Sequence, residues 1–174
     1  MNRPFARSDE RTYILCMLAK RVLLCDFDGV LHPTLGRGDA PAGGPLVATP
    51  HFGWIPALAG ALRGHDDVAL VVHSTWRHDY DDELREVLGV LGSRLIGATS
   101  RSLQRYESIL AWLVEYPVYA SYRILDDDPS EFPVPLPAEL ILRDPASGVA
   151  APAVLKALRA WVDGPRAGLP RTMK

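Results

Sequence analysis

The stretch Arg21–Val30, RVLLCDFDGV, decides the fold of this 174-residue chain. Its first half is a run of Val, Leu and Cys that stops at an aspartate, a pattern typical of a strand buried on both faces of a sheet. Two carboxylates, Asp26 and Asp28, follow at once. In α/β proteins, ligands bind beyond the carboxyl ends of such strands. The stretch therefore predicts a buried strand that delivers two acids to a candidate site.

Similar apolar runs recur along the chain and alternate with segments of helical spacing. We predict further strands at residues 68–73, 94–97, 118–125 and 139–142. We predict helices at residues 55–63, 79–91, 102–114 and 153–162. The apolar face of the helix at 102–114 would consist of Leu103, Tyr106, Ile109, Leu110 and Leu113. This alternation predicts an α/β fold, a three-layer Rossmann-like and mostly parallel sheet with helices on both faces.

Composition narrows the class of protein. Apolar residues make up 48% and charged residues 23% of the chain, as in globular domains. With 14 Gly and 15 Pro, long helices and coiled coils are excluded. A net charge of −2 offers no basic excess for non-specific binding to nucleic acid or anionic membranes. The two cysteines, Cys16 and Cys25, form no disulfide framework, so we expect a cytoplasmic protein without membrane contact.

The chain reads as one domain with two extensions. Residues 1–19 form a polar N-terminal extension that we expect to be partly disordered, and Met17 is an alternative start. Residues 20–163 form the domain, and residues 164–174 form a tail. Many of the Gly and Pro residues fall in 33–56 and 129–137, each of which follows an acidic segment.

Polar groups follow three of the predicted strands, where a parallel sheet would bring them together. Asp26 and Asp28 follow the first strand, Ser74 the second, and the acidic triplet 126–128 a later one. Crowded carboxylates repel one another unless a cation holds them. Oxygen ligands without a Cys/His cluster indicate Mg²⁺. A metal ion, an arginine and an aspartate are the groups that phosphoryl transfer requires.

In motif order, the chain resembles the haloacid-dehalogenase-like (HAD) phosphohydrolases. DFDGV resembles their first motif, VVHST their second, Arg105 the basic residue of their third, and ILDDD their fourth. TWR after the second strand, the spacing from Arg105 to Trp112, and the stretch from Asp144 to Val149 resemble the HAD domain of Swiss Army Knife RNA-repair proteins. This resemblance implies the same fold and a phosphatase activity.

The resemblance assigns the acids their roles. Asp26 would be the nucleophile and a Mg²⁺ ligand. Asp28 would be the general acid and base, and its main-chain carbonyl would also bind the metal. Asp126 would complete the metal site, with Asp127 beside it.

The phosphate-binding residues retain alternatives. Ser74 would hydrogen-bond the phosphate, or Thr75 if the strand ends one residue later. Arg105 would stabilise the charge that develops on phosphorus and bind substrate, although the family more often has Lys there, and Arg101 competes for the role. His32 is expected to border the site, and the other histidines are expected to be structural.

Neither the interval from Asp28 to Ser74 nor that from Ser74 to Arg105 holds a folded cap domain. In the family, an open site of this kind often serves a macromolecular end or relies on a partner protein for closure. The favoured activity is a Mg²⁺-dependent phosphomonoester hydrolase that acts through an aspartyl-phosphate on a terminal nucleic-acid phosphate. The alternatives are a phosphatase of a phosphoprotein or small metabolite, and a catalytically silent HAD-derived binding or scaffold module.

Overall fold

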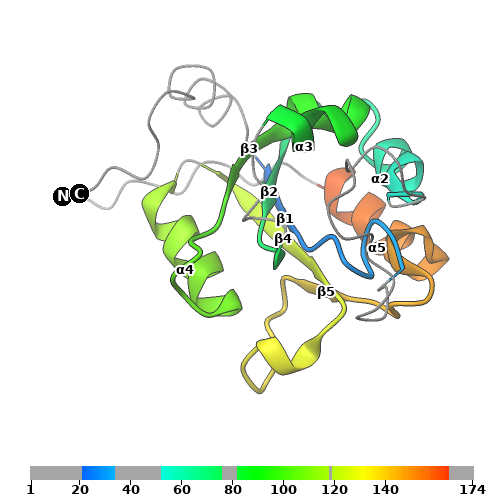
Figure 1. The fold of residues 1–174 in the computed structure, drawn as a ribbon. Coiled ribbons are helices and arrows are strands. Elements are labelled where there is room, and N and C mark those ends of the chain that lie inside the picture. Colours follow the sequence, from blue (N-terminus) through cyan, green and yellow to red (C-terminus); the bar gives the residue numbers. More distant parts are fainter. Residues whose placement is uncertain (1–20, 34–51, 76–81, 118, 165–174) are drawn as a thin grey trace, which may run out of the picture.

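A computed structural model describes residues 21–33, 52–75, 82–117 and 119–164 (Figure 1). Within these ranges, five strands form one sheet in the spatial order β3-β2-β1-β4-β5. Every neighbouring pair runs parallel. The strands are β1 (Arg21–Cys25), β2 (Val68–Val72), β3 (Leu95–Ala98), β4 (Ser121–Asp126) and β5 (Leu140–Leu142). The strand that carries the deciding sequence is therefore the central one.

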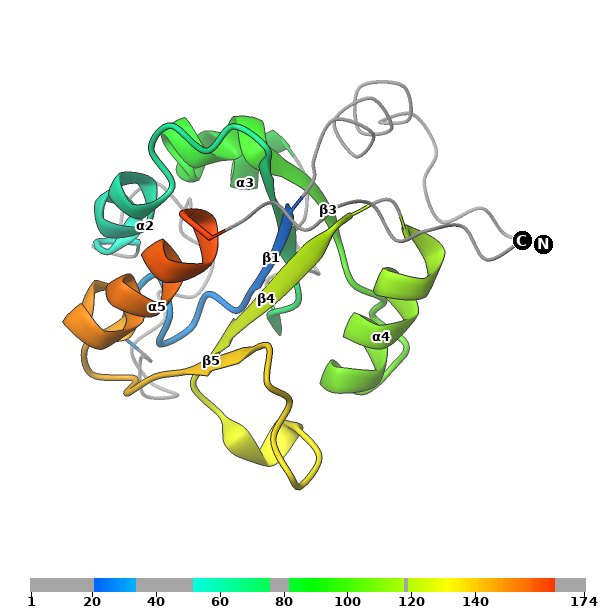
Figure 2. The same cartoon turned by 180° about the vertical axis from the view of Figure 1, so that it is seen from behind.

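Helices cover both faces of the sheet, which confirms the predicted three-layer α/β fold. They are α2 (Ile55–Ala61), α3 (Asp82–Val87), α4 (Arg105–Glu115) and α5 (Pro152–Val162). In both views α4 lies on one face, and α2 and α5 lie on the other (Figures 1 and 2). The hydrophobic residues after α3 pack into the same cluster as α2 and α5.

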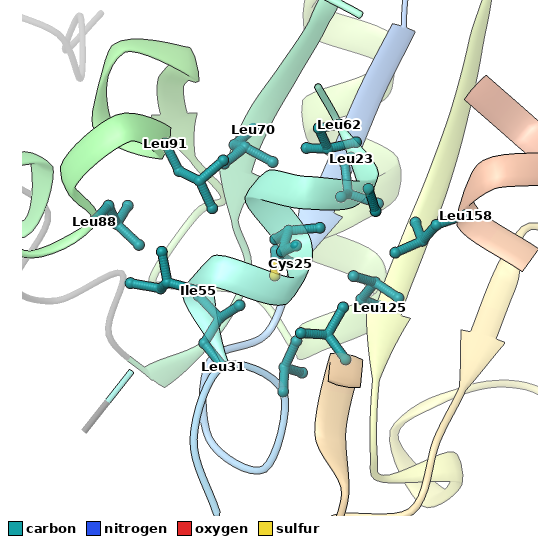
Figure 3. Packing of buried hydrophobic residues seen from close by; sticks show 14 of the residues in the cluster. Leu23, Cys25, Leu31, Ile55, Leu62, Leu70, Leu88, Leu91, Leu125 and Leu158 are labelled. Atoms are coloured by element: carbon teal, nitrogen blue, oxygen red, sulfur yellow. The ribbon is translucent and has the colours of Figure 1, made fainter. Parts of the chain in front are cut away.

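The alternation of side chains along β1 divides the core into two parts. Leu23 and Cys25 face the larger cluster, where they pack with Leu62, which directly follows α2, and Leu158 of α5 (Figure 3). Val22 and Leu24, on the opposite face of the strand, belong to the cluster that contains the buried side of α4. Because both faces are covered, the stretch from Val22 to Cys25 has to be apolar, as its sequence is, while the buried Arg21 at the start of β1 pairs with Asp67.

The segment predicted as one helix over 79–91 is divided. The α-helix α3 ends at Val87, and a 3-10 helix follows from Gly89 to Arg94. Gly89 has a φ of 53°, in the left-handed region that commonly ends an α-helix. Residues 79–81 lie outside the described part of the chain.

Helix α4 begins at Arg105, three residues later than predicted, and its apolar face also differs. Ser102 donates its backbone N–H to the Ser100 hydroxyl, and such local bonds compete with helix formation. Leu110, predicted to be buried, is 42% exposed. Trp112 is buried instead and stacks on Tyr116. Trp112 therefore serves the packing of α4 against the sheet.

The loop after β5 is hydrogen-bonded to the loop that carries Asp28. Asp144 accepts a backbone N–H from Ala146 through its side chain, which shapes the turn. Val149 then donates its N–H to the carbonyl of Val30, at 3.0 Å. The stretch from Asp144 to Val149 thus has a physical role, because it positions the segment that follows the first strand.

Gly148 makes a close approach in this loop that no other residue could make. Its φ is 53°, and a Cβ there would lie 2.0 Å from Cε3 of Trp54. We expect Gly148→Ala to lower the free energy of unfolding by about 3 kcal/mol, combining left-handed strain with overpacking. Gly89→Ala, with the same φ and no heavy atom within 4 Å, should lose only about 1 kcal/mol. If urea unfolding showed that the two variants lose equal free energy of unfolding, the packing role of Gly148 would be contradicted.

The described residues bear in part on the remaining expectations. Between Ser74 and Arg105 they contain only α3, the 3-10 helix and β3. Residues 34–51, in the interval after Asp28, lie outside them, as do 1–20 and 165–174 of the predicted extensions. None of the described helices combines the length and apolar character that a membrane span requires.

Candidate active site

The parallel register brings the polar strand ends to one edge of the sheet. Cys25, the last residue of β1, lies opposite Val72 of β2 and Leu125 of β4. The chain continues the ladder for one more step, because Asp26 donates its N–H to the Leu125 carbonyl and His73 donates to the Cys25 carbonyl. Residues that directly follow the three central strands therefore meet at this edge.

Arg105, the first residue of α4, joins the acids of two strands. Its Nη1 lies 3.2 Å from Oδ2 of Asp26 and 3.1 Å from Oδ2 of Asp126. The two carboxylates outweigh the opposing effect of burial and raise the pKa of the Arg105 guanidinium. Arg101 is exposed on the segment before α4. Of the two arginines that the sequence left open, Arg105 is the one in contact with Asp26.

Three carboxylates form a compact oxygen cluster. One oxygen each from Asp26, Asp126 and Asp127 lies within 4.8 Å of the others. Burial raises the pKa of Asp26, against the opposing effects of His73 and Arg105. Burial likewise raises the pKa of Asp126, which Arg105 opposes. Burial thus disfavours negative charge on both carboxyls.

The third acid of the ILDDD motif has a different task. Asp128 accepts hydrogen bonds from both the backbone N–H and the hydroxyl of Ser130. These bonds lower the pKa of Asp128 and start the short 3-10 helix Pro129–Glu131. Only the first two acids of the triplet belong to the carboxylate cluster.

Asp28 lies at the solvent side of the site. Its side chain is 39% exposed, and Oδ2 accepts a hydrogen bond from the Thr75 hydroxyl at 3.1 Å. His32, fully buried, has its Nε2 3.5 Å from Oδ1 of Asp28. His32 therefore borders the site, as expected. An exposed carboxylate with a hydroxyl donor on one oxygen and an imidazole near the other is well placed to exchange protons with a bound molecule.

Ser74 and Thr75 divide the contacts between the two acids of the first motif. Ser74 is buried, and a hydrogen bond from its side chain favours the ionised form of Asp26, lowering the pKa of that carboxyl. Thr75 is exposed and holds Asp28. Both side chains therefore face the site.

Two residues at this edge escaped the sequence interpretation. His73, expected to be structural, donates from Nε2 to the Leu125 carbonyl and has Nδ1 3.6 Å from Oδ2 of Asp126. Arg143 follows β5 and lies 3.6 Å from Oδ1 of Asp127. Both positions were open to inference, because each directly follows a predicted strand or closes one.

The cluster suits a hard divalent cation. Its donors are all carboxylate oxygens, the ligands that Mg²⁺ prefers, and they come from adjacent strand ends close enough to share one ion. Burial raises the pKa values of Asp26 and Asp126 and so disfavours their ionised forms. A bound divalent cation would counter this effect.

The parallel sheet carries acids at the ends of β1 and β4, where the resemblance to the HAD proteins led us to expect them. Residues 22–154 match the sequence model of the family described as the HAD domain in Swiss Army Knife RNA repair proteins. The match covers more than half of the chain, which therefore belongs to this family. No curated protein and no solved structure gave a significant match.

Proposed function

We propose that this protein is a Mg²⁺-dependent phosphomonoester hydrolase that acts through an aspartyl-phosphate on Asp26. The observation that carries the proposal is that Arg105 contacts both Asp26 and Asp126. The exposed Asp28 lies at the same edge of the sheet. A nucleophile, a cation for the transferring phosphoryl group and a proton donor are thereby within reach of one substrate group.

The proposed roles are those that the family resemblance implies, and these contacts support them. Oδ1 of Asp26 accepts the N–H of Phe27 and Oδ2 accepts Arg105, so the carboxylate is fixed in orientation. One of its oxygens would attack phosphorus as the bond to the leaving oxygen breaks. Asp28 would protonate that leaving oxygen and then take a proton from the water that hydrolyses the acyl phosphate. The Asp26 carboxylate is thereby regenerated and inorganic phosphate is released.

Residues Asp26, Asp126 and Asp127, with the main-chain carbonyl of Asp28, would hold the metal. When bound, Mg²⁺ supplies charge that favours the ionised carboxylates and neutralises phosphate oxygens. Arg105 would release its carboxylate partners in part and turn towards the phosphoryl group. Ser74 and Thr75 would donate hydrogen bonds to phosphate oxygens.

For the substrate we propose a terminal phosphate of a nucleic acid. Family membership among RNA repair proteins and the exposure of Asp28 support this choice. The net charge of −2 argues that the chain itself supplies little general affinity for the strand. Recognition would then be local to the phosphorylated end or supplied by a partner protein.

The activity can be tested by phosphate release from p-nitrophenyl phosphate and from oligoribonucleotides with a 3′- or 5′-phosphate. We expect release that requires Mg²⁺ and stops in EDTA, with kcat/KM on the order of 10²-fold higher for one oligonucleotide end, because remote contacts contribute binding energy. Equal values on all substrates would contradict the nucleic-acid proposal. Absence of Mg²⁺-dependent release from every phosphomonoester would favour the silent binding module.

A further inference from the structure

Arg143 reaches two of the groups that we propose as metal ligands. It directly follows β5 at the same edge of the sheet as Asp126. Its side chain is 0% exposed, and Nη2 lies 3.6 Å from Oδ1 of Asp127 and 3.4 Å from the main-chain oxygen of Asp28. The guanidinium of Arg143 thus lies against two oxygens, of Asp127 and Asp28, that we propose as ligands of a divalent ion.

The guanidinium is poorly satisfied for a buried cation. Nη1 donates to the Asp144 carbonyl over 3.3 Å, and the buried Nε has no hydrogen-bond partner among the described residues. Burial lowers the pKa of Arg143, while the attraction of Asp127 opposes that change. Arginine nevertheless remains charged in proteins. Since burying a charge without full hydrogen bonding is costly, its main favourable interaction is with the surrounding carboxylates.

The charges around the site show what this cation does. Four carboxylates and two guanidiniums face one another at this edge, namely Asp26, Asp28, Asp126, Asp127, Arg105 and Arg143. Their formal charges leave two negative charges, which one divalent ion neutralises. Without Arg143 the site would be more negative, and it would attract a divalent ion more strongly.

We propose that Arg143 is a built-in counter-cation that stabilises the metal-free site and holds its affinity for Mg²⁺ down. This inference rests on the proposed metal dependence of the same site. Arg143 is a positioning residue and not a catalytic one, because its side chain is buried from solvent and acts through the carboxylate and carbonyl oxygens that it contacts. The consequence is a site that exchanges Mg²⁺ readily and stays folded between binding events.

The test is calorimetric titration of the metal-free full chain with Mg²⁺ alone. We expect Arg143→Gln and Arg143→Met to bind Mg²⁺ about tenfold or more tightly than the wild type, because they remove a competing charge. Arg143→Lys keeps the charge and should stay within about threefold of the wild type. In metal-free buffer the Gln and Met variants should melt at lower temperature and recover with Mg²⁺.

Arg94→Gln is the matched control. Arg94 is also a largely buried arginine that donates to backbone carbonyls, those of Leu62, His65 and Val68, away from the carboxylate cluster. Its loss should lower the melting temperature and leave the Mg²⁺ affinity unchanged. A purely structural Arg143 would behave in the same way.

Unchanged or weaker Mg²⁺ binding in Arg143→Gln would overturn the inference, whatever the melting temperature. A variant that does not fold without metal can still be tested by adding Mg²⁺. The inference is supported if cooperative melting recovers at or below the Mg²⁺ concentration that half-saturates the wild type. Failure to recover at any Mg²⁺ concentration overturns it. A wild type without Mg²⁺-dependent phosphatase activity would contradict the proposed function instead, and the comparison of affinities would still decide the role of Arg143.

Discussion

Replacing Asp26 with asparagine is expected to reduce phosphate release by at least about 10⁴-fold, because the amide cannot act as the nucleophile. The fold should survive the change. Asparagine has nearly the same shape and keeps an acceptor for the N–H of Phe27. Steady-state kinetics on p-nitrophenyl phosphate with saturating Mg²⁺ would measure the loss. Residual activity within tenfold of the wild type would remove Asp26 from the nucleophile's role.

The same variant tests the electrostatics of the metal-free site. Because burial raises the pKa of Asp26, its ionised form weakens the folded state at neutral pH. Stability from this group is fully present below the unfolded pKa and is lost as pH rises through the raised folded pKa. We therefore expect Asp26→Asn to melt at or above the wild-type temperature at pH 7, with the difference vanishing towards pH 4. A less stable variant at pH 7 would contradict this sign.

Removing Arg105 should impair activity and stability together. Arg105→Ala leaves Asp26 and Asp126 buried without their shared guanidinium. We expect a loss of about 3 kcal/mol in the free energy of unfolding at pH 7 without metal. We also expect a decrease of about 10²- to 10³-fold in kcat/KM, since one preorganised donor to the phosphoryl group is gone. Arg105→Lys keeps the positive charge and introduces the residue found more often in the family. This variant should therefore retain much of the stability and much of the activity.

The stability defect of Arg105→Ala should depend on pH, and Arg101→Ala serves as the control variant. Without the guanidinium, the carboxyls of Asp26 and Asp126 bind protons more readily, so the stability defect of Arg105→Ala should shrink as pH falls. Added Mg²⁺ should shrink it as well. Arg101→Ala should leave the kinetics near wild type, because Arg101 is exposed on the segment before α4. A larger kinetic loss in Arg101→Ala than in Arg105→Ala would reverse the assignment.

The fold was predictable because the chemistry that specifies it is local. Buried parallel strands must be apolar on both faces, so β2, the part of β1 after Arg21 and the buried end of β4 are visible in the sequence as apolar runs that end at polar residues. The order of the strands follows from pairing between residues distant in sequence. It was therefore first seen in the structure.

Helix boundaries were less predictable, since short-range competition decides them. Gly89 breaks a segment whose apolar spacing continues to Leu91. The hydroxyls near Ser102 delay the start of α4. Leu110 fits a helical stripe as well as Trp112 does, and the position of the sheet determines which of them is buried.

The candidate site shows the same division between local and long-range information. Asp26, Asp28 and Asp126 could be named because each follows a buried strand. Arg143 also follows a strand, but β5 is a short edge strand, and its contacts with Asp28 and Asp127 depend on pairing with β4. Long side chains that reach across strand ends can be placed only when the neighbouring strands are known.

The central claim is that Asp26 carries the phosphoryl group during turnover. Reduction with borohydride converts an aspartyl-phosphate to homoserine, which peptide mass spectrometry can locate. The most direct measurement applies this trap to Asp28→Asn with Mg²⁺ and p-nitrophenyl phosphate, whose leaving group needs no protonation, so that the intermediate accumulates. The account predicts homoserine at position 26, absent without substrate and absent from Asp26→Asn. Phosphate release by the wild type with an unmodified Asp26 in every trapped sample, or homoserine at another acid, would contradict it.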